Sequence, residues 1–265
     1  MHRTVVLDVV GLSPRLMGAD TPNLNRLAAR GAMRTLRAVT PAVTCPAQAT
    51  FTTGRLPRDH GIVAKGWYHR DLSEVMFWRQ SNPLVEGEKI WEAAKARDPG
   101  FTCAKLFWWF NMYSSADVSV TPRPQYPADG RKIPDIYTQP GALREELTAK
   151  LGPFPLFRFW GPAADLVSSR WIADCALYVG ATRKPTLTLV YLPHLDYVLQ
   201  RRGPDAPEIA AEVRAVDALC GEVLEPVERE GGRAIVLSEY GITRVDGAVH
   251  PNRVLRARGW LRVRE

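Results

Sequence analysis

Apolar runs alternate with amphipathic stretches along most of this chain. Residues 4–10 are β-branched with no polar face, which is typical of a buried central strand. After a loop, Asp20-Thr21-Pro22 supplies a helix N-cap and a proline for the first turn, and Gly31 ends the apolar periodicity. The pattern therefore predicts a first unit of strand, loop and helix.

The alternation continues toward the C-terminus and predicts an α/β fold. Two long segments have no clear period: residues 61–86 are expected to form a loop or small hairpin, and residues 111–140 an insertion or lid. Strands are expected at residues 35–39, 103–110, 186–192 and 234–237, and helices at residues 47–53, 88–97, 141–151, 163–181 and 208–230. This order favours one domain over residues 1–265, a doubly wound, mostly parallel sheet with helices on both faces.

Composition narrows the range of partners. The net charge of +7 suits an anionic partner, but the arginines are spread along the chain and no nucleic-acid-binding signature accompanies them, so a small anionic substrate is expected and specific nucleic-acid binding is not. No apolar run is long enough for a membrane span, and the N-terminal run is too short and polar for a signal peptide, which favours a cytoplasmic location. The four cysteines are scattered, as expected for thiols outside disulfides. The oligomeric state is left open.

Oxygen-bearing side chains stand where the predicted strands end and a helix begins. Asp8, Asp196 and Glu239 follow apolar strands, and Thr44 begins a helix. Carboxylate and hydroxyl oxygens suit Zn, Mn or Mg, and the amides at a helix N-terminus attract phosphate. Two alternatives stay open: Thr44 is only an N-cap, or the neighbouring Cys45 is the nucleophile, since a helix N-terminus lowers a thiol pKa.

Three motifs around Thr44 resemble a known family. They are Thr44-Cys45-Pro46, Thr53-Gly54-Arg55-Leu56-Pro57 and His60-Gly61-Ile62-Val63. Together with Asp8 they resemble the nucleophile segment and metal-binding aspartate of the alkaline phosphatase superfamily, specifically its nucleotide pyrophosphatase/phosphodiesterase (type I phosphodiesterase) branch. The resemblance extends from Val5 to Gly241 and implies an alkaline phosphatase-like fold.

The resemblance also implies roles for single residues. Thr44 would attack phosphorus and bind one metal of a pair together with Asp8, and Asp196 would hold the other, zinc being the expected ion. Lys65 stands where that branch has an oxyanion-contacting asparagine, and could contact a phosphate oxygen as a point charge. Arg55 is a second candidate for substrate binding because it is near Thr44 in sequence.

The second metal site departs from the family pattern. Gln200 replaces the histidine of the family's Asp-x3-His-x2-Gly-Pro segment, and Glu239-Tyr240-Gly241 replaces Asp-His-Gly. A glutamine carbonyl coordinates more weakly than imidazole, and a tyrosine ligates only when ionised. The family's last metal-binding histidine lies far downstream, whereas this chain ends 24 residues after Gly241, so either the chain is a fragment or the chemistry has changed.

Other residues are candidate replacement ligands for the metal or have purely structural roles. His194 would point away from the site if its strand continued, whereas His60 is expected to hold its loop together, and His250 is either a surface residue or a late replacement ligand. The aromatic residues at 107–110 are expected in the core, together with Trp67, Tyr68 and Trp78, although a share in a substrate pocket stays open.

The leading hypothesis is a metal-dependent hydrolase of phosphodiester or related phosphate and phosphonate esters with a threonine nucleophile. The main alternative is a catalytically impaired phosphate-ester-binding protein that keeps the fold but has a degenerate metal site at Gln200, Glu239 and Tyr240. A third hypothesis, an anion-binding or interaction protein that uses only its basic surface, explains fewer residues.

Overall fold

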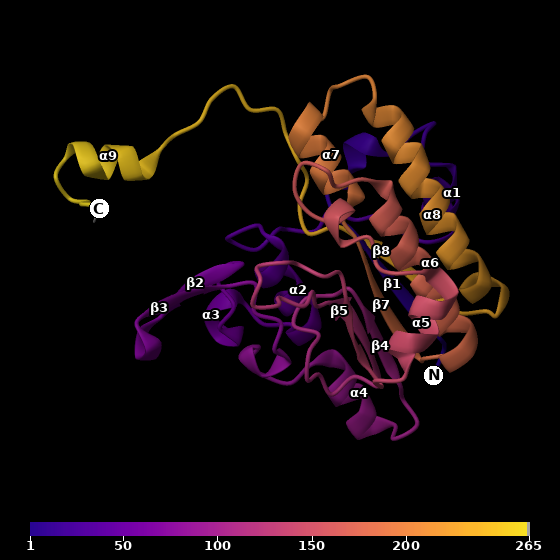
Figure 1. Cartoon of the computed structure of the whole chain (residues 1–265). Helices are drawn as coiled ribbons and strands as arrows, with labels where there is room; N and C mark the ends of the chain where they lie inside the picture. The colour runs from indigo at the N-terminus through magenta and orange to yellow at the C-terminus, as the bar shows by residue number, and fades with distance from the viewer. Residues whose placement is uncertain (264–265) are drawn as a thin grey trace.

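A six-stranded sheet with the strand order β6-β5-β4-β7-β1-β8 forms the centre of the protein (Figure 1). The computed structural model describes residues 1–263. All neighbouring strands pair in parallel except β5 and β6, which are antiparallel. The expectation of a mostly parallel sheet is confirmed. The strands are β1 (Thr4–Val9), β4 (Cys103–Leu106), β5 (Val118–Pro122), β6 (Ile136–Gln139), β7 (Leu187–Leu192) and β8 (Arg233–Leu237).

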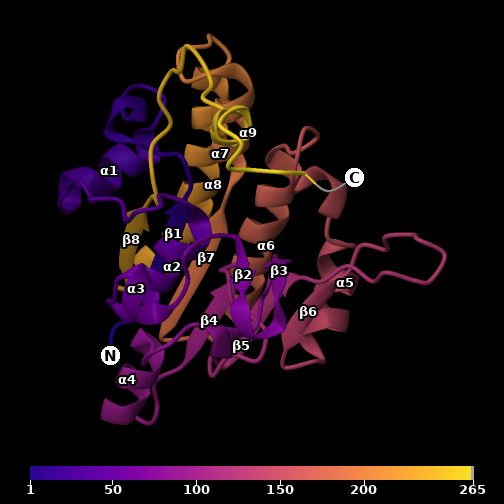
Figure 2. The same cartoon turned by 90° about the vertical axis from the view of Figure 1, so that its left-hand side faces the viewer.

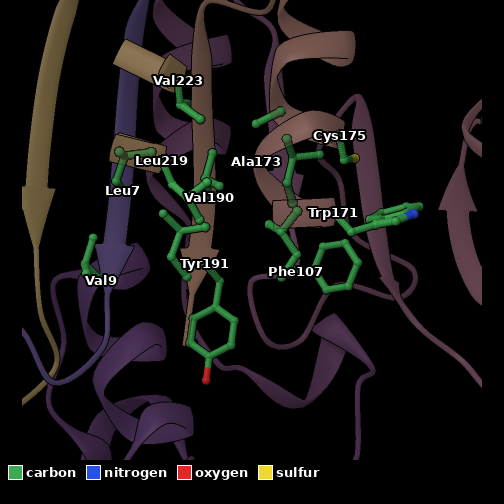
Figure 3. Packing of buried hydrophobic residues seen from close by; sticks show 14 of the residues in the cluster. Leu7, Val9, Phe107, Trp171, Ala173, Cys175, Val190, Tyr191, Leu219 and Val223 are labelled. Atoms are coloured by element: carbon green, nitrogen blue, oxygen red, sulfur yellow. The ribbon is translucent and has the colours of Figure 1, made fainter. Parts of the chain in front are cut away.

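One face of the sheet is covered by α5 (Leu143–Leu151), α6 (Leu166–Arg183) and α8 (Ile209–Arg229). Figure 3 shows Leu7 of β1 and Val190 of β7 packed against Leu219 and Val223 of α8. Nearer the other edge, Phe107 lies beside Trp171 of α6, with ring centroids 5.7 Å apart. This face holds the larger part of the hydrophobic core.

The opposite face of the sheet carries α2 (Thr44–Thr53) and α4 (Ile90–Arg97). Side chains alternate along a strand, so Val6 of β1 packs with Trp91 of α4 on this face while Val5 and Leu7 point to the other. Asp8 follows the parity of Val6 and is therefore directed toward α2. A two-stranded antiparallel hairpin of β2 (Gly66–His69) and β3 (Glu74–Phe77) lies on the same side as α2 and α3 (Pro57–His60) (Figure 2).

The remaining helices are peripheral. α1 (Pro22–Arg30) packs on α8, α7 (His194–Arg202) begins directly after β7, and α9 (Pro251–Ala257) lies at the end of an extended, exposed segment (Figure 1). Among residues 1–263, no helix has the length and apolarity that a membrane crossing needs. Short 3-10 turns lie at Pro14–Leu16, Arg70–Leu72, Asn82–Leu84 and Leu156–Arg158.

Three sequence expectations are wrong. Residues 35–39 form no strand; they are largely exposed and pair with no other strand. Residues 111–140 are not a separate lid, because they contain β5 and β6, and residues 123–135 between these strands form a mostly exposed loop. Because that region contains several prolines, its sequence pattern does not indicate the two short strands, whose residues are mostly buried. Residues 107–110 do not belong to the strand expected at residues 103–110, since β4 ends at Leu106.

Candidate active site

Thr44 is the first residue of α2, and its hydroxyl is not the helix cap. The N-cap is Val43, whose backbone is extended with φ of −138°, and no side chain caps the helix. Gly54, with φ of 66°, ends it in the left-handed conformation that glycine adopts easily. Thr44 is only 1% exposed, and its Oγ1 has no hydrogen-bond partner. The N-cap interpretation is therefore wrong: the hydroxyl is buried and unused at a helix N-terminus.

Asp8 and Glu239 meet in front of α2, held by the amide of Gln48. Gln48 Nε2 donates to Asp8 Oδ2 at 2.8 Å and to Glu239 Oε1 at 2.9 Å. Its own Oε1 accepts the backbone N–H of Trp109 at 2.7 Å, which fixes the orientation of the amide. Sequence reasoning missed Gln48, although its position four residues after Thr44 placed both on one helix face.

The two carboxyl groups share a buried, crowded environment. Burial raises the pKa of Asp8 to about 7, against the lowering effect of hydrogen bonds from Glu239 and Gln48. Burial and then the charge of Asp8 raise the pKa of Glu239 well above its ordinary value. The Thr44 hydroxyl lies close enough to lower the pKa values of Glu239 and Tyr240 slightly, but not in regular hydrogen-bond geometry with either.

Three oxygens of this group have no hydrogen-bond partner among residues 1–263. They are Asp8 Oδ1, Glu239 Oε2 and Thr44 Oγ1, all buried. Buried polar atoms are normally satisfied, so three unpartnered oxygens in one place fit a divalent cation, for which such oxygens are suitable ligands. Within residues 1–263, no three His, Cys, Asp or Glu side chains are grouped to hold an ion, so the donor set here is two carboxylates and a hydroxyl.

Asp196 lies nearby in the first turn of α7, and its environment differs. Asp196 Oδ1 accepts hydrogen bonds from Gln200 Nε2 at 2.9 Å and from the Tyr240 hydroxyl at 3.0 Å. Burial, followed by the charges of Asp196 and Glu239, raises the pKa of Tyr240, which keeps its phenol neutral. The structure thus brings together Asp196, Gln200 and Tyr240, but as hydrogen-bond partners of one another.

Cys45 and Lys65 lie near the N-terminal end of α2, whereas Arg55 lies beyond its C-terminal end. Burial raises the pKa of Cys45, so this thiol stays protonated, which argues against it as the nucleophile. Lys65 is close enough for its charge to lower the Cys45 pKa slightly, and its Nζ lies 5.9 Å from the centre of the Trp78 ring. Arg55 follows the far end of α2, which at 1.5 Å per residue is about 15 Å long, and packs on Gly87. The structure therefore does not bring Arg55 to Thr44.

The histidines have other roles. His60 Nδ1 accepts the backbone N–H of Ile62 at 3.1 Å, and its Nε2 lies 3.0 Å from Thr50 Oγ1, so it holds its loop to α2, as expected. His194 Nε2 lies 2.7 Å from Glu212 Oε2 of α8, away from Asp196. His250 is exposed next to α9.

Most of the aromatic segment is core. Phe107 and Trp108 belong to the cores on the two faces of the sheet. Trp78, Trp109 and Trp160 form a separate group with ring centroids 5.9 to 6.4 Å apart, and Trp78 is 55% exposed. Since Trp109 donates to Gln48, this group lies next to the carboxylates.

The fold and this arrangement of side chains define an α/β protein with a mostly parallel sheet and a cluster of buried oxygens at one end of its strands. The chain belongs to the type I phosphodiesterase/nucleotide pyrophosphatase family, which it matches over residues 4–265.

Individual relatives are distant. An uncharacterized pyrophosphatase/phosphodiesterase of Schizosaccharomyces pombe is 27% identical over 233 residues, 84% of this chain and 41% of the relative. Phosphonoacetate hydrolase from Sinorhizobium meliloti 1021, solved with phosphonoacetate, superposes with a TM-score of 0.71 at 18% identity, covering 98% of this chain and 62% of that one.

An inactive threonine-to-alanine variant of murine ectonucleotide pyrophosphatase/phosphodiesterase 5, solved in complex with AMP, superposes with a TM-score of 0.63 at 17% identity. The match covers 93% of this chain and 59% of the murine chain. At such identity the two structural matches establish the fold alone. The chain thus spans between two fifths and about three fifths of the length of these relatives.

Proposed function

We propose that this chain hydrolyses phosphodiesters or related phosphate and phosphonate esters with Thr44 as the nucleophile. The observation that carries the proposal is the buried, unpartnered Thr44 hydroxyl at the N-terminus of α2, beside the unpartnered oxygens of Asp8 and Glu239. Family membership supports ester hydrolysis. The inactive murine variant that lacks a threonine, and its bound AMP, support the choice of a threonine and of a phosphate ester.

A divalent cation completes the proposed site. Asp8, Thr44 and Glu239 would hold it through the three unpartnered oxygens. The ion, zinc in the first instance with manganese or magnesium as alternatives, would supply a Lewis acid that lowers the hydroxyl pKa and offsets phosphate charge. The N-terminal amides of α2 and the ammonium of Lys65 add positive potential on the same side.

The proposed reaction begins with in-line attack by Thr44 Oγ1 on phosphorus. The bond from Oγ1 to phosphorus forms as the bond to the leaving ester oxygen breaks, and the hydroxyl proton passes through solvent to the leaving oxygen. Water then cleaves the phosphothreonine ester and regenerates the hydroxyl. Gln48 keeps both carboxylates in place during these steps.

Turnover of bis(p-nitrophenyl) phosphate and p-nitrophenyl phosphate with added zinc or manganese tests the proposal. Thr44→Ala is expected to lower kcat by at least ~1000-fold, since it removes the nucleophile. Thr53→Ala is the matched control, because its hydroxyl lies at the other end of α2, where it donates to the Ala49 carbonyl at 2.7 Å and accepts the Arg55 N–H at 3.2 Å. Unchanged turnover in Thr44→Ala rejects the proposal.

One observation favours a second candidate, a phosphate-ester-binding protein with impaired catalysis. Asp196 is engaged by Gln200 and Tyr240, which leaves one fewer carboxylate for metal. In that case inorganic phosphate or AMP would raise the melting temperature while no ester was turned over with any of the three metals. The two candidates are separated by measuring both quantities on the same preparation.

A further inference from the structure

Two groups of oxygens lie side by side in this site. One group contains oxygens without hydrogen-bond partners, and the other contains an oxygen that accepts two hydrogen bonds. Asp8, Glu239 and Thr44 each leave one buried oxygen without a partner. In the other group, a single oxygen of Asp196 accepts two hydrogen bonds, of 2.9 Å and 3.0 Å. A buried polar atom without a partner is costly, whereas a carboxylate oxygen with two donors is satisfied. Only the first group therefore has buried oxygens that still need a binding partner.

We propose, building on the hydrolase function above, that this chain binds a single divalent cation at Asp8, Thr44 and Glu239, and that the Tyr240 hydroxyl and the Gln200 amide take the place of a second cation on Asp196. Both groups present protons to the carboxylate. An amide nitrogen has no lone pair for a metal, and the Tyr240 hydroxyl already donates to the Asp196 oxygen at 3.0 Å. Asp196 is thereby stabilised by two donors without any ion.

Contacts from several segments keep Asp196 and its two hydrogen-bond donors in place. Gln200 follows Asp196 by one helical turn on α7, which places both on one face. The segment that carries Tyr240 is fixed to the loop after β1, because Ser238 Oγ donates to the Tyr240 carbonyl at 2.9 Å and accepts the Gly11 N–H at 3.1 Å. A Cβ on Gly11 would lie 3.2 Å from the Asp196 nitrogen, so these segments are closely packed. Space for an ion between Tyr240 and Asp196 would require them to separate.

The charges also favour one ion. Asp8 and Glu239 together balance one divalent cation, whereas a second ion beside them would have only Asp196. The nearest histidine in sequence, His194, faces Glu212 at 2.7 Å and does not supplement Asp196. Within residues 1–263, no three acidic, histidine or cysteine side chains gather around an ion position.

Metal stoichiometry tests the proposal without measuring catalysis. The purified chain is dialysed to equilibrium against zinc chloride, and bound zinc is measured by mass spectrometry. We expect one equivalent in the wild type, one in Asp196→Asn and one in Tyr240→Phe, which removes only the hydroxyl. Asp8→Asn, which retains the shape of the side chain, is expected to lower zinc affinity by ~100-fold or more. Circular dichroism confirms that each variant is folded.

Two equivalents in the wild type would overturn the single-cation proposal, and so would loss of the ion in Asp196→Asn. If two equivalents bind while Thr44→Ala abolishes turnover, the hydrolase function stands and only this inference fails. If one equivalent binds and no ester is turned over, the inference stands and the hydrolase function fails. The absence of bound zinc in the wild type rejects the inference and removes the cation from the proposed function.

Discussion

At the scale of single residues, Lys105 is the least expected side chain. It lies fully buried in β4, where its Nζ donates to the Phe110 carbonyl at 2.9 Å and lies 4.7 Å from the centre of the Trp91 ring. Burial lowers the pKa of Lys105 from 10.5 to about 7. Between these two values the unfolded chain binds more protons than the folded one, so this residue makes the protein more stable as pH rises.

Lys105→Met should remove that pH dependence. Relative to Lys105→Met, the wild type is expected to gain up to about 2.7 kcal/mol of unfolding free energy between about pH 7 and about pH 9, at 1.36 kcal/mol per pKa unit. Urea denaturation at both pH values measures it. Lys150→Met, at an exposed position on α5, should change with pH as the wild type does. Parallel pH profiles for wild type and Lys105→Met would contradict the prediction.

Gln48 is the second residue whose importance depends on its partners. Gln48→Leu keeps roughly the same volume but leaves the Trp109 N–H without an acceptor and two carboxyl groups without a donor. A loss of about 2 to 4 kcal/mol in unfolding free energy is expected from the unsatisfied groups. Gln125→Leu is the control, because Gln125 also donates to a carboxylate, that of Asp135, but in an exposed loop. Equal effects of the two substitutions would show that burial is not the cause.

At the scale of elements, α1 is capped from another helix. The side chain of its N-cap residue, Thr21, makes no capping hydrogen bond. Instead, the buried carboxylate of Asp217 on α8 accepts the first-turn N–H groups of Asn23 at 3.0 Å and Leu24 at 2.9 Å. A carboxylate also complements the positive end of the helix dipole. The long α8 thus fixes where α1 begins.

Asp217→Asn should therefore destabilise the protein by about 1 to 3 kcal/mol, because an amide has one acceptor oxygen and no charge for these donors. The loss is read from chemical denaturation, and hydrogen exchange should show faster exchange at Asn23 and Leu24. Glu225→Gln, at an exposed position on the same helix, is the control. Protection of α1 that is unchanged in Asp217→Asn would contradict this account.

At the scale of the whole molecule, the proposed cation site joins distant parts of the chain. Asp8 lies near the end of β1, Thr44 begins α2 and Glu239 follows β8, so the three oxygens meet only in the folded state. A ligand that binds only the folded state stabilises it by mass action. Cation binding and global stability should therefore be coupled.

Zinc at ~100 times its dissociation constant should add about 2.7 kcal/mol to the unfolding free energy, seen as a higher melting temperature. Asp8→Asn should abolish most of this shift. Asp71→Asn, an exposed acidic position in the turn before β3, should keep it. An equal zinc shift in the wild type and in Asp8→Asn would show that the ion binds elsewhere.

Much of the fold follows from local pattern. The β-branched run at β1 and the apolar runs at β7 and β8 predict three neighbouring strands, and the amphipathic pattern of α8 predicts the long helix that covers them. The errors concern short or exposed segments. Residues 35–39 have strand-like composition but no neighbouring strand, while β5 and β6 are recognisable as strands only because of the partners they find in the sheet.

For the site, the sequence predicts that Asp8, Thr44, Asp196 and Glu239 come to one end of the sheet, because parallel strands end together. The hydrogen bonds of each group follow only from the tertiary fold. It gave Asp8 and Glu239 the amide of Gln48, gave Asp196 the donors of Tyr240 and Gln200, left Thr44 free, and placed Arg55 elsewhere. The physical reason is that most of a buried group's partners come from segments remote in sequence, and local pattern carries no information about which remote atoms will meet.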